Sequence, residues 1–325
     1  MPVGRSMSLR IRPSTFADFP ALAELLRAAQ ARRAASAPEL KRLVGQLREH
    51  PVRPHFHELL AEDRGRLVGH LMVYQNVGRF HPGHYDVEIA VHPDAQGRGL
   101  GRRLAQEAQA HLSALNPEKL LSGTYEHHER GLAFLAQQGF TERFRYFDNV
   151  LDLRTWKAER WPVPALGGGL RLLTLADLIA GQGEEAAWRA FHAAFAEARQ
   201  DAPSEEPPAP TLYEVFRQRA QAPGYSPQSV FLAVTGGGEV VAVTELKTDP
   251  QDAALMHIGL TGTRRAWRRR GLALALKLAG MHWAQASGAR HIKTGNATSN
   301  AAILAINGRL GFRPERVRVE FARPL

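Results

Sequence analysis

The chain has 325 residues, of which 44% are hydrophobic and 23% charged, proportions typical of a globular protein and not of a disordered or fibrous one. It has no cysteine, which excludes disulfides, a thiolate nucleophile and cysteine-ligated metal sites, and no apolar run approaches about 18 residues. The first ten residues lack the apolar core of a secretory signal, so we expect a cytoplasmic protein with no membrane partner and no metal.

The net charge of +10 attracts polyanions such as nucleic acid or phosphate-rich cofactors. The densest basic run is Arg264–Arg265 with Arg268–Arg270. Elsewhere the basic residues are dispersed, as a general preference for arginine would produce. We therefore expect no nucleic-acid partner.

In chain order, the first half predicts a strand, one or two helices, an antiparallel strand group, and then a strand, helix, strand, short helix and final strand. This order indicates an α/β fold. The expected strands are residues 9–12, 57–62, 66–75, 85–91, 119–124 and 144–153. The helix after Gly99 has one apolar stripe that should face a sheet, formed by Leu100, Leu104, Ala108 and Leu112.

The second half repeats this order. Its expected strands include residues 230–234, 239–247, 254–260 and 291–294, and its matching helix has Leu272, Leu276, Ala279 and Trp283 on one face. Gly99 matches Gly271, and Phe140 matches Phe312, at one offset, since 271 − 99 and 312 − 140 both equal 172. Self-similarity of this kind indicates two homologous domains.

Two tracts interrupt the pattern. A Pro- and Gly-rich stretch at residues 161–169 cannot continue a helix or a strand. We therefore predict domains at 1–155 and 169–325 with a linker at 156–168. The polar, Pro-rich tract at 201–210 reads as a surface loop, either edging a substrate cleft or serving as a solvated insertion.

The turn from Gln96 to Gly101 connects an apolar strand to the amphipathic helix. N–H groups in the first turn of a helix point outward, and glycines let an anion approach the backbone, so a diphosphate could bind there, with charge from Arg98 or Arg102. The same sequence could instead form a tight strand-to-helix connection that binds no anion. Arg102 replaces the third glycine of a dinucleotide fingerprint, and neither half has the Gly-Lys-Ser/Thr of a Walker-type loop.

The turn resembles the Gln/Arg-x-x-Gly-x-Gly/Ala signature of the GNAT N-acetyltransferase superfamily, which binds the pyrophosphate of coenzyme A. The matching residues are Gln96, Gly99 and Gly101 in the first half and Arg268, Gly271 and Ala273 in the second. The resemblance implies two tandem GNAT-like domains, each a mixed, mostly antiparallel sheet flanked by helices, with acetyl-CoA as co-substrate. The residues implied at the cofactor are Val91, Gln96, Gly97, Arg98, Gly99, Leu100 and Gly101, and Thr263, Arg268, Arg269, Arg270, Gly271, Leu272, Ala273 and Asn300.

The segment from Asn296 to Phe312 resembles the NAxSNxxMxxxNxxLGF pattern of one GNAT branch, which includes two-domain members such as mycothiol synthase. The resemblance implies that Asn300 contacts the pantetheine arm. Asn300 could equally cap the helix that follows it. The first half departs from this pattern at Thr124–His128.

In this family an amine attacks the thioester, and a backbone N–H on the strand before the turn polarises the carbonyl, here at Val91 or Thr263. Glu88 is the candidate base of the first half, with Asp86 on the same face of its strand. Substrate recognition or a solvated strand end are the alternatives for Glu88. The second half has Leu260 at that place, so a base there, if the second half has one, comes from elsewhere, with Glu245 and His257 as candidates.

The family's general acid is often a Tyr five residues before the Phe of the late corner, where this chain has Leu135 and Asn307. Tyr125 is a further candidate, and a thiolate can also leave unprotonated. We therefore expect an N-acetyltransferase for a small-molecule amine, active in one half and either monomeric or homodimeric. The alternatives are a non-catalytic acetyl-CoA-binding protein and a protein N-acetyltransferase.

Overall fold

The structure is a computed structural model that describes residues 8–31 and 36–325. Residues 1–7 and 32–35 of the predicted first domain lie outside the described part. The chain forms two compact units: unit 1 is Met1–Phe144 with Arg318–Leu325, and unit 2 is Arg145–Val317. Among the described residues, no helix is both long and apolar enough to span a membrane.

Unit 1 is a mixed sheet with the strand order β1-β2-β3-β4-β5-β12, in which only the β4–β5 pair is parallel. The predicted α/β class with a mostly antiparallel sheet is confirmed. Its elements are β1 (Leu9–Pro13), α1 (Phe19–Ala28), α2 (Ala37–Glu49), β2 (Phe56–Asp63), β3 (Arg66–Tyr74), β4 (His84–Val91), α3 (Leu100–Leu112), β5 (Lys119–Tyr125) and α4 (Glu129–Gln137).

The two faces of this sheet pack against different helices, because side chains alternate along each strand. On one face, Gly69 of β3 leaves room for α3: a Cβ there would lie 3.1 Å from both Leu100 and Leu104. All four residues of the predicted α3 stripe are buried, which confirms that prediction. On the other face, Ala90 of β4 packs with Phe19 and neighbouring residues of α1.

Unit 2 repeats the arrangement with the strand order β6-β11-β10-β9-β8-β7. Only its β10–β11 pair is parallel. Its elements are β7 (Arg171–Thr174), α5 (Leu175–Gln182), α6 (Glu184–Gln200), α7 (Tyr213–Arg217), β8 (Val230–Val234), β9 (Val240–Thr248), β10 (Leu255–Thr263), α8 (Leu272–Ala286), β11 (His291–Ala297) and α9 (Ala301–Leu310). Leu272, Leu276 and Ala279 of α8 are buried, and Trp283 is partly buried against the same core.

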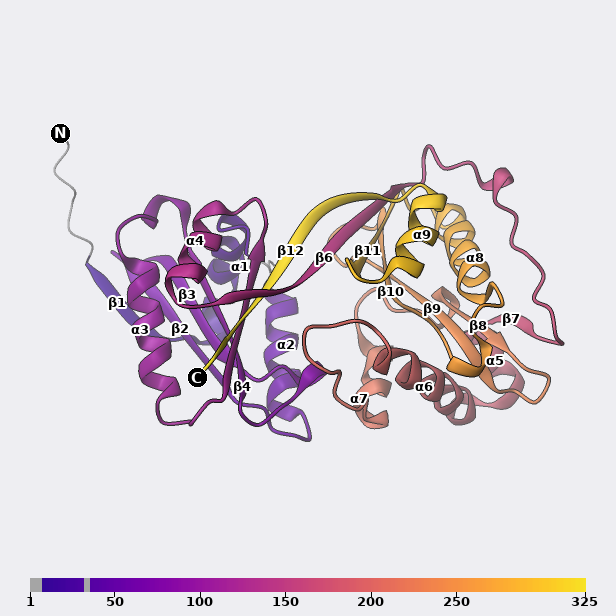
Figure 1. Ribbon diagram of the computed structural model, residues 1–325, viewed down its shortest axis with the longest axis horizontal. Helices are drawn as coiled ribbons and strands as arrows, with labels where there is room; N and C mark the ends of the chain where they lie inside the picture. Colours follow the sequence, from indigo (N-terminus) through magenta and orange to yellow (C-terminus); the bar gives the residue numbers. More distant parts are fainter. Residues whose placement is uncertain (1–7, 32–35) are drawn as a thin grey trace. The chain divides into compact units, whose positions relative to one another are not determined.

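The last strand of each half pairs in the other unit. Strand β6 (Thr141–Asp152) pairs with β11, from His291↔Asp152 to Ala297↔Tyr146. Strand β12 (Arg313–Pro324) pairs with β5 of unit 1 from Arg318 to Pro324, and Figure 1 shows the yellow strand running from α9 to the C-terminus. The compact units therefore differ from the predicted sequence halves 1–155 and 169–325 by an exchange of final strands. Each half supplies its last strand after an equivalent Gly-Phe corner.

Candidate active site

In unit 1 the parallel strands β4 and β5 pair over three residues and then separate. The pairs are His84↔Lys119, Tyr85↔Leu120 and Asp86↔Leu121. Beyond them the carbonyl of Val87 accepts a 2.8 Å hydrogen bond from the Ser122 hydroxyl. Because a buried carbonyl needs a partner, this side chain replaces the lost ladder bond at the point where the strands diverge. We call this divergence the split.

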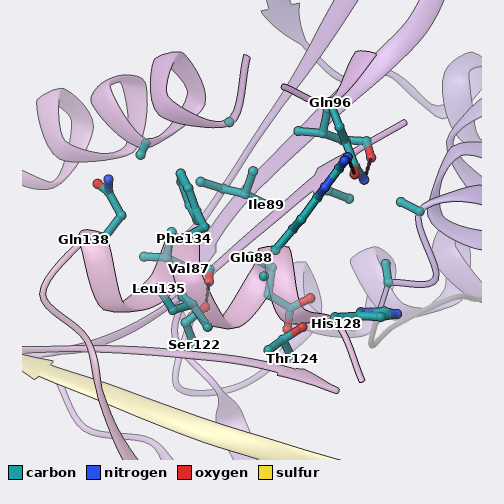
Figure 2. A pocket seen from close by; sticks show the side chains of 18 of the residues that line it. Val87, Glu88, Ile89, Gln96, Ser122, Thr124, His128, Phe134, Leu135 and Gln138 are labelled. Atoms are coloured by element: carbon teal, nitrogen blue, oxygen red, sulfur yellow. Dashed lines mark hydrogen bonds between the residues drawn. The ribbon is translucent and has the colours of Figure 1, made fainter. Parts of the chain in front are cut away.

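The split opens into a cavity of about 800 Å³ in unit 1. Its walls are the end of α1, the outer half of β4, the glycine turn, α3, the end of β5 and α4. Figure 2 shows Glu88, Thr124 and His128 toward one side of this cavity and Phe134 and Gln138 toward the other. Of the predicted cofactor residues in the first half, those that line the cavity are Val91, Gln96, Gly97, Gly99, Leu100 and Gly101.

The glycine turn has a left-handed backbone at two positions. In unit 1 these are Gly97 (φ +74°) and Gly99 (φ +82°), and a Cβ on either would meet no atom within 4 Å. Gly99 precedes Leu100, the first residue of α3, and carries no capping side chain. The first N–H groups of α3 are therefore left for an incoming anion.

The turn of unit 2 has the same backbone. Arg269 (φ +61°) and Gly271 (φ +77°) occupy the two left-handed positions, at the offset of 172 from Gly97 and Gly99. An L-residue at positive φ is strained, so the repeat conserves the conformation even where the glycine is lost. Among the other predicted residues of this turn, Leu272 is buried and Arg270 stacks over the Trp267 ring, with 4.7 Å from its guanidinium carbon to the ring centroid.

Glu88 lies on β4 and lines the cavity. One of its oxygens accepts a 3.0 Å hydrogen bond from the Tyr74 hydroxyl on β3. Asp86, predicted to share its face, is buried and forms an ion pair with Arg79 at 2.5 Å. Asp86 thus has a cationic partner, which also lies 3.6 Å from Glu320, and of the two strand carboxylates Glu88 is the one that lines the cavity.

In unit 2 the carboxylate at this level of the sheet comes from the neighbouring strand. Glu245 of β9 is buried, forms an ion pair with Arg219, and accepts a 3.3 Å hydrogen bond from the N–H of Leu260. A Cβ on Gly259 would lie 2.5 Å from a Glu245 oxygen, so the glycine makes room for this carboxylate. The β9–β10 register shifts between Ile258 and Thr261, beside the same carboxylate.

Glu245 has an aromatic neighbour in Tyr225, whose hydroxyl is buried. Burial, with the charge of Glu245 as a second cause, holds the pKa of Tyr225 well above its usual range. The other candidate base, His257, lies at the beginning of β10 in a partly exposed hydrogen bond with Asp249, 2.8 Å apart. This pair gives His257 a structural partner, and nothing in its contacts connects it to Glu245.

The asparagines of the second half form a network. The Asn296 side-chain oxygen accepts hydrogen bonds from Asn307, at 2.7 Å, and from Asn149 of β6, at 3.4 Å. Asn300 accepts from the Ile303 N–H at 3.4 Å and caps α9, as one of the two predicted roles requires. The Asn307 side-chain oxygen is buried without a partner among the described residues.

Lys277 is the feature of unit 2 that sequence reasoning missed. It lies on α8 at the position of Ala105, since 277 − 172 = 105, and Ala105 and Phe140 both line the cavity of unit 1. Lys277 as a whole is 1% exposed. Its buried amine lies 5.2 Å from the centroid of Phe312, the counterpart of Phe140, and has no hydrogen-bond partner in the described structure. The corresponding space in unit 2 therefore holds a lysine side chain. Burial lowers the pKa of Lys277 to about 7.

The basic turn of unit 2 is paired with an acid from the polar tract at 201–210. Asp201 contacts Arg265, at 2.6 Å, and Arg268. Hydrogen bonds from these arginines, first from Arg265, lower the pKa of Asp201 and keep it ionised. Asp201 therefore occupies donors of the turn of unit 2 that another anion would otherwise use.

Comparison with known proteins agrees with this geometry. The profile of the acetyltransferase (GNAT) family matches residues 20–140 and 188–312. The chain therefore belongs to the GNAT acetyltransferase family and carries its domain twice. It is an N-acetyltransferase, and the family uses acetyl-CoA as co-substrate.

Two curated relatives are mycothiol acetyltransferases. The Nocardiopsis dassonvillei protein is 27% identical over 285 residues, covering 83% of this chain and 82% of the relative. That of a Nocardioides species is 30% identical over 240 residues, covering 70% and 76%. Among solved structures, a tandem GNAT protein from the clavulanic acid biosynthesis pathway matches at 20% identity and a TM-score of 0.72, covering 98% of both chains. A GCN5-related N-acetyltransferase from Sphaerobacter thermophilus matches at 21% and 0.68, covering 97% and 95%.

Proposed function

We propose that unit 1 binds acetyl-CoA in the cavity at the split and transfers its acetyl group to a small-molecule amine. The observation that carries this proposal is one cavity of about 800 Å³ whose lining includes the glycine turn, the part of β4 that β5 does not pair with, and Glu88. The diphosphate would bind the N–H groups after Gly99, with the exposed Arg98 and Arg102 nearby. The thioester would lie along β4 beyond Asp86, where β5 no longer pairs.

Glu88 is the proposed base. An amine must be neutral to attack the thioester carbonyl, and Glu88 on the cavity wall would accept the proton that the amine loses as the new C–N bond forms. The C–S bond then breaks and the electron pair leaves with the sulfur. The backbone N–H of Val91 is proposed to polarise the carbonyl, and the Tyr74 hydroxyl would hold the Glu88 carboxylate in position.

Unit 2 is proposed to have a supporting role. Lys277 fills the space that corresponds to the cavity wall at Ala105, and Asp201 pairs with the arginines of the turn. Both features oppose an incoming diphosphate and pantetheine arm. There are two alternatives. In the first, unit 2 catalyses the reaction through Glu245. In the second, unit 1 binds acetyl-CoA without catalysis.

Kinetics with a panel of primary amines tests the proposal, with CoA thiol release as the readout. We expect Glu88→Gln to lower kcat by a factor of about 10²–10⁴ while acetyl-CoA affinity stays within a few-fold. Tyr74→Phe should cause a smaller loss of kcat, because it removes the hydrogen bond to the Glu88 carboxylate and leaves the carboxylate in place. Glu24→Gln, on the exposed side of α1, is the matched control. Wild-type turnover by Glu88→Gln would contradict the assignment, and acetyl-CoA binding without turnover on any amine would favour the non-catalytic alternative.

A further inference from the structure

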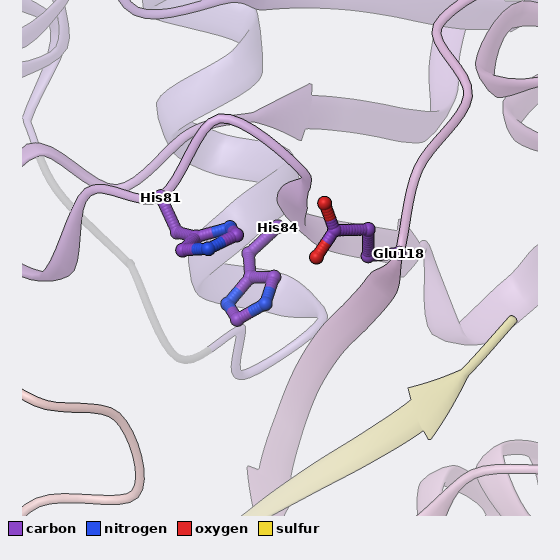
Figure 3. A group of neighbouring side chains, drawn as sticks. All are labelled: His81, His84 and Glu118. Atoms are coloured by element: carbon purple, nitrogen blue, oxygen red, sulfur yellow. The ribbon is translucent and has the colours of Figure 1, made fainter.

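Two histidines and a glutamate gather at the closed end of the β4–β5 pair, away from the split. They are His81 in the loop before β4, His84 at the first residue of β4, and Glu118 directly before β5. One ligand atom from each lies within 4.8 Å of the other two. Figure 3 shows the three side chains turned toward one another.

The loop around Gly83 is shaped to hold Glu118. The Glu118 N–H donates to the Gly83 carbonyl at 2.8 Å. A Cβ at Gly83 would lie 2.6 Å from the Glu118 carboxyl carbon and 2.7 Å from one of its oxygens. A side chain at residue 83 would therefore displace the carboxylate from its present position beside the histidines, and glycine leaves that position open.

The donor set selects a class of ion. Two imidazole nitrogens and one carboxylate oxygen suit zinc and the neighbouring divalent transition metals, whereas magnesium and calcium prefer oxygen ligands. The histidines are half-buried and Glu118 is exposed, which leaves the ion a route from solvent and a position for water. The chain has no cysteine, so no thiolate competes for the ion elsewhere.

Coordination requires a small rearrangement. Ligand atoms at 2.0–2.2 Å from a tetrahedral ion lie about 3.4 Å apart, less than the present limit of 4.8 Å. The two rings are stacked, with centroids 3.9 Å apart and planes 28° apart, so at least one must turn to direct its lone pair at the ion. The ring torsion of histidine is broad, so a ring can turn about its side-chain bonds. His81 accepts a 3.2 Å hydrogen bond from the Gly83 N–H on Nδ1, so its Nε2 is the nitrogen left for the ion.

We propose that His81, His84 and Glu118 bind a zinc-class divalent cation that fastens β4 to β5 at the closed end of the split. Only three residue pairs are in register between β4 and β5, so few backbone hydrogen bonds join the two strands. A metal ion across its first residues ties the loop before β4 to the segment before β5. The ion keeps the strands together at one end while they separate at the other to form the cavity.

Calorimetric titration of zinc chloride into the full-length, untagged, chelator-treated protein tests this site. We expect one equivalent of zinc, no binding of magnesium, and a melting temperature that rises with zinc. His84→Ala and Glu118→Gln should each weaken zinc binding at least about tenfold and lose the rise in melting temperature. His111→Ala is the control, because His111 belongs to a separate histidine group with His55 and His57.

Two outcomes would overturn the proposal. One is that the wild-type protein binds zinc more weakly than in the micromolar range or not at all. The other is zinc binding that survives both His84→Ala and Glu118→Gln and is lost in His111→Ala. Melting curves of the metal-free variants serve as the folding check, and Gly83→Ala provides an independent variant that keeps all three ligands. It should weaken zinc binding by displacing the Glu118 carboxylate.

Discussion

The side-chain amide of Gln96 donates to the carbonyl of Val91 at 3.1 Å, so the first residue of the turn motif braces the end of β4. Unit 2 repeats the contact: Arg268 donates from Nε to the carbonyl of Thr263 at 3.2 Å, on residues offset by 172. The long donor at this position therefore fixes the path of the turn. This explains why glutamine and arginine alternate there, since both reach back five residues with an N–H donor.

The Ser122 hydroxyl is predicted to stabilise unit 1 at the origin of the split. Ser122→Ala leaves the buried Val87 carbonyl without its partner and should lower the free energy of unfolding by about 1–3 kcal/mol. Ser113→Ala is the matched control, because its hydroxyl also donates to a backbone carbonyl, that of Ala110, but at an exposed site. Urea denaturation compares the two, and equal losses would show that the Ser122 bond has no special role.

Lys277 is predicted to make stability depend on pH. Its pKa is lowered to about 7 in the folded chain from 10.5, so between these values the unfolded chain binds more protons. Stability from this group should therefore rise with pH above 7, by about 1.4 kcal/mol per unit, and the full cost of the buried charge applies below 7. Lys277→Met should thus be more stable than wild type, most at pH 6 and least near pH 10. The exposed Lys157→Met is the control, and a pH-independent difference for Lys277→Met would refute the assignment.

Asp201 is predicted to suppress anion binding at the turn of unit 2. Asp201→Asn removes the acid that pairs with Arg265 and Arg268, so inorganic pyrophosphate should bind this variant more tightly at low salt. The effect is best measured by calorimetry in a Gly99→Glu background, which removes the turn of unit 1. Glu315→Gln, which breaks a surface ion pair with Lys293, provides the same change of charge elsewhere. If both substitutions raise affinity equally, the effect is general and not local.

The sequence was sufficient for the features that depend on local pattern. The constant offset of 172, the α3 stripe and the turn all follow from periodicity and glycine placement, and the structure contains them. Arg269 shows the limit of that reasoning, because a left-handed arginine has no local signal. Its conformation could be inferred only from its counterpart Gly97.

The features that depend on tertiary packing could not be derived in this way. Backbone hydrogen bonds between strands do not depend on side-chain identity, so the exchange of β6 and β12 has no local sequence signature. Lys277 looks like an ordinary polar residue of an amphipathic helix, yet α8 is buried on more than one side. Comparison with Ala105 at the same offset was the signal that could have singled it out.

The role of Ser122 could not be predicted from the sequence, because its hydroxyl donates to the carbonyl of Val87 on another strand. The place of Glu88 on its strand could be predicted, but its partner Tyr74 belongs to β3, and the ion pair of Asp86 with Arg79 depends on a loop contact. The catalytic roles of Glu88 and Glu245 remain predictions.

The central claim is that unit 1, and not unit 2, holds acetyl-CoA, and calorimetric titration of acetyl-CoA tests it most directly. Gly99→Glu and Gly271→Glu place a charge in the two turns, and Gly65→Glu and Gly288→Glu control for strain, because all four glycines have φ between +77° and +84° with open space around a Cβ. We predict that the wild type, Gly271→Glu and both controls each bind one equivalent of acetyl-CoA and that Gly99→Glu binds none. Binding that survives Gly99→Glu and disappears in Gly271→Glu would contradict the account and move the site to unit 2.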